Sequence, residues 1–105
     1  MSSSINFVEY IAETINSVGF VSYTKMFGEY LIYCNRKPII LVCDDTAYVK
    51  ILPETTAILG ADNPKSSPYA GAKLYYILDP DNRAQLMETA KVLERVIPIP
   101  NPKTK

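Results

Sequence analysis

The stretch that decides the fold is residues 23–50, YTKMFGEYLIYCNRKPIILVCDDTAYVK. It is rich in Tyr, Val, Ile and Leu, and short breaks containing Gly, Asn or Asp divide it. This pattern predicts strands over 20–26, 29–34, 38–43 and 46–51. Because the breaks are so short, neighbouring strands must run antiparallel.

Helical patterns flank this meander. Apolar residues recur at helical spacing over 4–18, and PETTAILG at 53–60 begins with a proline and ends with a glycine, so both segments predict helices. The polar, proline-containing segment 61–71 predicts a surface loop. AKLYYIL at 72–78 predicts a fifth strand, and 79–97, which opens with Asp-Pro, predicts a third helix capped by the aspartate.

The predicted order is therefore α-β-β-β-β-α-β-α. It predicts an α+β fold with two layers, in which a mainly antiparallel five-stranded sheet carries helices on one face. The other face of the sheet is then open to solvent or to a partner. One domain is expected over 1–97, followed by a flexible proline-rich tail over 98–105.

The composition limits the class of protein. Among 105 residues, 11 Lys and Arg balance 11 Asp and Glu, whereas general nucleic-acid and anionic-membrane binders usually carry a basic excess. No apolar run approaches the roughly 20 residues of a membrane span. The start, MSSSINFVEYIAE, lacks the pattern of a secretory signal, so a cytoplasmic protein is expected.

Several chemistries are disfavoured. The chain has no histidine, which removes the usual Ser-His-Asp and Cys-His catalysis and most zinc, copper and iron sites. Its four glycines form neither a dinucleotide fingerprint nor a P-loop. We therefore expect no enzyme, no metal and no cofactor. Glu29 and Lys50 remain open as an acid and an amine of one site, or as a surface ion pair.

The two cysteines predict free thiols. Cys34 and Cys43 fall on the two arms of a hairpin that turns near 35–37, so Cys43 is expected to face Gly28 or Tyr30. The sulfur atoms would then lie more than about 10 Å apart, too far for a disulfide. The acidic pair at 44–45 is interpreted as a turn.

Three expected strands each place one tyrosine and one lysine on the same face, since side chains two positions apart on a strand point to one side. If the three faces coincide, the open side of the sheet is an aromatic and cationic surface. The alternative is an ordinary solvated sheet face with protective lysines. The candidate binding residues are Tyr23 with Lys25, Tyr48 with Lys50, and Tyr75 with Lys73.

The segment KMFGEYLIYCNRKPIILVCDDTAYVKI at 25–51 resembles the N-terminal domain family of TfoX (Sxy), the bacterial competence regulators. The later PYAGAKLYYI at 68–77 is similar to that family's last strand, and the resemblance covers roughly 7–97. The family's first motif is matched by Met26, Phe27, Gly28 and Tyr30, and its last by Asp44, Asp45, Tyr48, Val49 and Lys50.

The resemblance implies a two-layer domain related to the secretion-chaperone-like architecture. It also implies a regulatory and not a catalytic role, exercised through protein contacts, and it carries over no catalytic residue. Full-length competence regulators have a further C-terminal helical domain, to which the resemblance does not extend. Physically, Met26 and Phe27 are expected to fill core, and Gly28 to permit a tight turn.

Three functions remain as hypotheses. The first is a small regulatory or adaptor domain that binds another protein, with a homodimer as one way to complete the sheet. The second is nucleic-acid binding through the tyrosine and lysine face. The third is a small-ligand protein in which the 61–71 loop covers a pocket near Lys50 and Tyr69.

Overall fold

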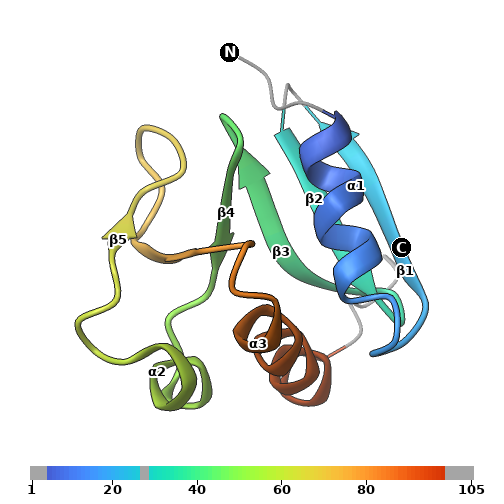
Figure 1. The fold of residues 1–105 in the computed structure, drawn as a ribbon. Coiled ribbons are helices and arrows are strands. Elements are labelled where there is room, and N and C mark those ends of the chain that lie inside the picture. Colours follow the sequence, from blue (N-terminus) through green and yellow to red (C-terminus); the bar gives the residue numbers. More distant parts are fainter. Residues whose placement is uncertain (1–4, 27–28, 99–105) are drawn as a thin grey trace.

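The fold is given by a computed structural model, in which the structure of residues 5–26 and 29–98 is described. The described elements include three helices and six strands in a single sheet (Figure 1). In chain order they are α1 (Ile5–Thr14), β1 (Val21–Met26), β2 (Glu29–Cys34), β3 (Lys37–Cys43), β4 (Thr46–Val49), α2 (Pro53–Leu59), β5 (Lys65–Ser66), β6 (Tyr75–Leu78) and α3 (Arg83–Val96).

The sheet has the order β1-β2-β3-β4-β6-β5, and every described pair of strands is antiparallel. The predicted α+β class and the antiparallel meander are thus confirmed. The predicted number of five strands is wrong, because the two-residue strand β5 lies inside the segment expected to be a loop. Lys65 and Ser66 pair with Tyr76 and Tyr75 of β6, a pairing too short to leave a strand pattern in the sequence.

Two tight turns set the register of the meander. Asn35 and Arg36 join β2 to β3, and Asp44 and Asp45 join β3 to β4, all four with positive φ between 53° and 69°. Two-residue loops with positive φ at both positions match the right-handed twist of a hairpin, and Asn and Asp tolerate this conformation. The interpretation of residues 44–45 as a turn is confirmed.

A β-bulge interrupts the pairing of β2 with β3. Ile32 pairs with Ile40 but Tyr33 pairs with Pro38, so Ile39 is the extra residue. The bulge allows the consecutive Ile39 and Ile40 both to be buried in the core, which regular alternation would forbid. It also changes which residues of β2 lie opposite the end of β3.

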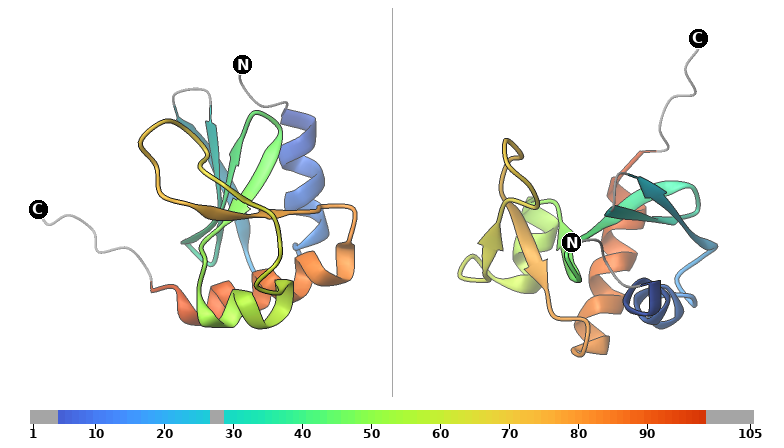
Figure 2. Two further views of the ribbon diagram at one scale, coloured as in Figure 1. Left: turned by 90° about the vertical axis from the view of Figure 1, so that its left-hand side faces the viewer. Right: turned by 90° about the horizontal axis from the view of Figure 1, so that it is seen from above.

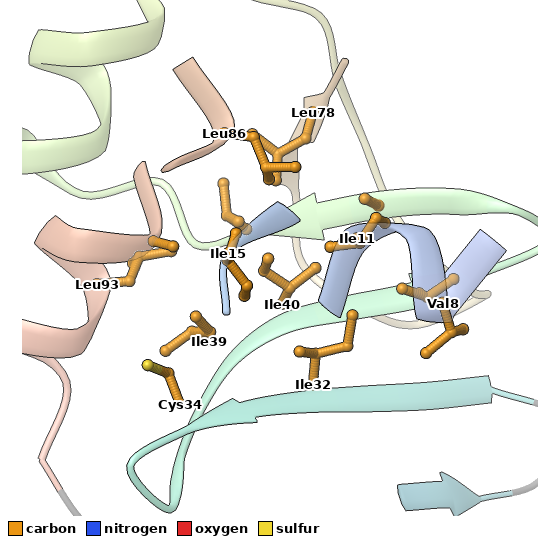
Figure 3. Packing of buried hydrophobic residues seen from close by; sticks show 14 of the residues in the cluster. Val8, Ile11, Ile15, Ile32, Cys34, Ile39, Ile40, Leu78, Leu86 and Leu93 are labelled. Carbon is orange, nitrogen blue, oxygen red and sulfur yellow. The ribbon is translucent and has the colours of Figure 1, made fainter. Parts of the chain in front are cut away.

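One core fills the side of the sheet that faces the helices. Side chains from α1 and α3 meet side chains from the central strands, as Figure 3 shows for Val8, Ile11 and Ile15 packing over Ile32 and Ile40. Helix α1 contacts β1 and β2, while α3 contacts β3 and lies beside α2 (Figures 1 and 2). The helices α1 and α3 therefore share one core with the sheet.

Two helix boundaries differ from the prediction. Helix α1 ends at Thr14, and residues up to Val18 continue only as turns. Helix α3 is capped by Asn82, whose side-chain oxygen accepts from the Gln85 amide at 3.3 Å. The Asp79 side chain instead accepts from the amide of Asp81, which makes a turn before the helix.

Most of the predicted tail 98–105 lies outside the described residues, as does residue 4, where the first helix was expected to begin. Within the described part of the chain, no helix combines the length and apolar character required to cross a bilayer.

Candidate functional site

Away from the bulge at Ile39, the two faces of the sheet are distinguished by the alternation of side chains along each strand. Tyr30, Val42, Ala47 and Leu78 align across four strands and are buried beneath the helices. The residues next to them along each strand point to the opposite side of the sheet, which we call the open face. Its central row runs across the same four strands and consists of Leu31, Leu41, Tyr48 and Ile77.

The expected coincidence of the three tyrosine and lysine faces is wrong. Tyr23 pairs with buried Ile32, and Lys25 pairs with buried Tyr30, so both point toward the helix side. The Tyr23 hydroxyl donates to the Glu9 carboxylate of α1 at 3.0 Å, which raises the pKa of Tyr23 above its ordinary value. The spacing of residues along β1 could not predict this orientation, because the pairing register of β1 with β2 decides which side chains of β1 face the helices.

The other four candidate residues do lie together at the open face. The rings of Tyr48 and Tyr75 meet edge to face with centroids 6.5 Å apart. Lys50 follows β4, and Lys73 precedes β6 in the loop that leads to it, and both border a hollow of about 310 Å³ together with Tyr75. Lys73 therefore reaches the site from a loop and not, as predicted, from a strand.

The segment 67–74, which we call the covering loop, lies on the side of the sheet opposite α1 (Figure 2, left). Pro68 is buried there, and its carbonyl oxygen accepts from the thiol of Cys43 at 3.3 Å. The Ser67 hydroxyl donates to the carbonyl of Ala72 at 2.9 Å and closes the loop on itself. The covering loop is therefore fixed at its base, while Tyr69 stays 52 % exposed.

A second hollow, of about 250 Å³, lies between the covering loop and the open face. It brings together Glu29, Lys50 and Tyr69; the sequence had suggested Glu29 and Lys50 as one possible site and, separately, a pocket near Lys50 and Tyr69. Leu31, Leu41 and Pro38 supply apolar wall, a contribution that the sequence analysis missed although Leu31 alternates with the core residues of β2. We call this space the Lys50 hollow.

The strand register separates the two charged residues that border the Lys50 hollow: Glu29 lies level with the end of β3, whereas Lys50 follows β4 toward the start of β3, so the hollow has an acidic end and a basic end. The Cys43 thiol lies 3.9 Å from the Glu29 carboxylate, and burial, followed by the charge of Glu29, raises the pKa of Cys43. Lys50 also borders the neighbouring hollow with Lys73. Among the described residues, no ion pair or side-chain hydrogen bond engages the ammonium group of Lys50 or of Lys73.

Both cysteines are free, as predicted. The expected partner of Cys43 is different, however, because the bulge at Ile39 brings Cys43 beside Glu29 and not beside Gly28 or Tyr30. Burial raises the pKa of the Cys34 thiol as well. In residues 5–26 and 29–98, no three side chains of the types that bind metals converge.

The motif residues divide between the two faces. Tyr30 is buried in the core, whereas Met26 is 45 % exposed and borders the Lys50 hollow, so the expectation that Met26 fills core is wrong. Phe27 and Gly28 lie outside the described residues.

A further hollow, of about 400 Å³, lies between α1 and β1 and is bordered by Glu9, Glu13 and Tyr23. The sequence did not indicate this hollow, because residues 4–18 predicted only a helix. Tyr23 and Glu9 already bind each other there, and Tyr23 is the one candidate binding residue among the residues that border this hollow, whereas four lie at the open face. We therefore take the open face as the candidate site.

Comparison with known proteins gives a relative that matches over nearly the whole length of the chain. The chain is similar to the "Uncharacterized 12.7 kDa protein in trpE 5'region" of Spirochaeta aurantia, with 24% identity over 106 residues. The match covers 98% of this chain and 90% of that protein, so it includes both the core and the open face. No protein-family model matches the chain.

Proposed function

We propose that this chain is a small regulatory or adaptor domain that acts by binding another protein through the open face of its sheet. The resemblance of 25–51 to the TfoX N-terminal domain implies such a role. The balance of 11 basic and 11 acidic residues also favours a protein partner over a polyanion.

The observation that carries the proposal is the apolar character of the open face. Leu31, Leu41, Tyr48 and Ile77 form a row across four neighbouring strands, and the three aliphatic members keep part of their surface exposed. Tyr69 and Leu74, which are 52 % and 54 % exposed, extend this surface along the covering loop. Contiguous apolar surface of this kind, bordered by charged residues, is typical of protein interfaces.

The edge of the sheet is less suited to a partner. Strand β1 is at one end of the sheet, and its exposed residues are Thr24, Lys25 and Met26. A lysine on an edge strand opposes pairing with another strand. The open face is therefore the better candidate for both a different protein and a second copy of this chain.

The proposal is tested by capture from a lysate of the source cells, in nuclease-treated and untreated halves. The bait is compared with a Tyr69→Asp/Leu74→Asp variant and with Phe20→Asp, a control at a residue that is 68 % exposed outside the open face. A supporting result is a protein that wild type and Phe20→Asp retain in both halves, that the double variant loses, and that binds wild type after purification.

Two outcomes contradict the proposal. If the double variant retains the same proteins as wild type, the open face is not the interface. If the captured proteins are lost after nuclease treatment, nucleic acid becomes the better candidate, and its binding should weaken steeply with salt.

A further inference from the structure

We propose that the Lys50 hollow binds a small monocarboxylate with an apolar body, its carboxylate at Lys50 and its body along the open face. The inference goes beyond protein binding and does not depend on it, since it concerns the isolated chain. It rests on one observation: the sheet and the covering loop together place charged and apolar side chains around one small hollow.

Apolar and aromatic side chains form a wall of the hollow. Leu31, Leu41 and Pro38 border the hollow from the sheet, and Tyr69 and Tyr75 border it from the covering loop and β6. At about 250 Å³ the hollow is smaller than most sites for drug-sized molecules. Its occupant should therefore be a small molecule, whose apolar body would be stabilised by leaving water.

The basic end selects an anion. Lys50 borders both this hollow and the adjoining one, where Lys73 is its neighbour. No described acidic group pairs with either ammonium. A carboxylate placed between the two hollows would receive a charge-assisted hydrogen bond from Lys50 beside the aromatic ring of Tyr75.

The acidic end limits the ligand to one carboxylate. Glu29 borders the same hollow as Lys50, and its carboxylate lies 3.9 Å from the sulfur atom of Cys43. A second carboxylate on the far end of the ligand would approach Glu29 and be repelled by its charge. The hollow is therefore expected to discriminate between a monocarboxylate and a dicarboxylate of equal length.

The test uses the purified full chain and three probes of the same length: hexanoate, hexanamide and hexanedioate. Binding is followed by isotope-edited NMR titration, which measures weak affinities and reports which residues shift. Hexanoate is expected to bind about tenfold more tightly than hexanamide, as a charge-assisted hydrogen bond predicts, and also more tightly than hexanedioate. The largest shifts are expected at Leu31, Leu41 and Tyr75.

Two variants separate the two ends of the hollow. Lys50→Gln should weaken hexanoate about tenfold and leave hexanamide unchanged. Glu29→Gln should remove the preference for hexanoate over hexanedioate. Lys25→Gln is the matched control. Like Lys50, Lys25 is an exposed lysine close to tyrosines of the sheet, but its side chain points to the helix side.

Each of the following results overturns the inference: hexanoate binds no better than hexanamide, Lys50→Gln binds hexanoate like wild type, or the shifts gather away from the open face. All three variants change exposed or half-buried polar side chains, so their folding can be verified in the same spectra. Failure here would leave the proposed protein partner untouched, because that partner is tested with Tyr69 and Leu74.

Discussion

The aromatic rings of Tyr48 and Tyr75 meet edge to face across β4 and β6, with their planes inclined at 78°. The pair joins two strands that the chain connects only through α2 and β5. Tyr48 is only 8 % exposed although it lies on the open face, which means that Tyr75 and the neighbouring row of side chains cover it. The contact thus has a structural role within the candidate site.

The coupling between these two rings can be measured with Tyr48→Leu, Tyr75→Leu and the double variant. Edge-to-face aromatic pairs contribute about 0.5–1.5 kcal/mol beyond the burial of area, so the double variant should be less destabilised than the sum of the single variants by about that amount. The free energy of unfolding is obtained from urea denaturation. Tyr33→Leu changes a residue on the same face but outside this pair, so its effect on the free energy of unfolding should be additive with that of Tyr75→Leu. If the effects of Tyr48→Leu and Tyr75→Leu are also additive, the finding is contradicted.

Gly19→Ala is expected to destabilise the protein by about 2 kcal/mol. A Cβ at residue 19 would lie 2.6 Å from the side-chain nitrogen of Asn35 and 2.8 Å from its oxygen. Asn35 could not move freely, because its oxygen accepts from the Phe20 amide at 2.9 Å and its nitrogen donates to Glu94 at 3.1 Å. Urea denaturation measures the loss.

The control is to introduce Gly19→Ala into a variant that already carries Asn35→Gly. Asn35 has a φ of 53°, which glycine adopts without strain, so this change removes the side chain and preserves the turn. In that background the added methyl group meets no side-chain atom of residue 35, and its cost should fall to a few tenths of a kcal/mol. An unchanged cost would show that something other than Asn35 excludes a side chain at residue 19.

The sequence could predict the meander well, because its signals are local. The alternation in 29–34 and the turns at 35–36 and 44–45 are each contained in a few residues. The faces of β1 could not be predicted in this way, since the burial of Tyr23 depends on its pairing with Ile32 and on Glu9 of α1. Likewise, the bulge at Ile39 leaves no local mark and yet decides which residue meets Cys43.

The candidate site was predictable only in part, for a related reason. Tyr48 and Lys50 could be placed on one face from their spacing along a single strand. The covering loop could be recognised as a loop, but its position depends on Pro68 being buried against Cys43, a contact between segments 25 residues apart. Long-range contacts of this kind are fixed by the packed fold and not by local spacing.

Glu29→Gln is expected to accelerate alkylation of Cys43 by iodoacetamide. Burial raises the pKa of Cys43 first, and the charge of Glu29 raises it further. Removing that charge lowers the pKa, so at pH near 8 more thiolate, which is the reactive form, is present, and the rate should rise about threefold. The rate is read by mass spectrometry of the peptide that contains Cys43.

Two comparisons make the alkylation result specific. Glu13→Gln, on α1, should leave the rate at Cys43 unchanged. Cys34, which is fully buried, should react far more slowly than Cys43 in every variant. If Glu29→Gln leaves the rate at Cys43 unchanged, the carboxylate does not act on the thiol, and the acidic end of the Lys50 hollow is not as described.

The acid sensitivity of the fold should depend on Glu94. A hydrogen bond from the Asn35 side chain, followed by one from Lys37, holds the pKa of Glu94 below its ordinary value of 4.5. Because the pKa is lower in the folded than in the unfolded state, the stabilisation is fully present above pH near 4.5. It is lost as the pH falls through the lower value of the folded protein.

Glu94→Gln should therefore flatten the acid limb of the stability profile, measured by urea denaturation at a series of pH values from neutral down to about pH 3. Wild type should lose stability below pH near 4.5 more steeply than the variant, and Glu88→Gln, an exposed residue of the same helix, should follow wild type. Since the Asn35 hydrogen bond is the larger cause, most of the difference should persist at about 0.5 M salt, where charge interactions between exposed groups are largely screened. Parallel profiles for wild type and Glu94→Gln would show that the contacts of Asn35 and Lys37 with Glu94 do not favour its charged form.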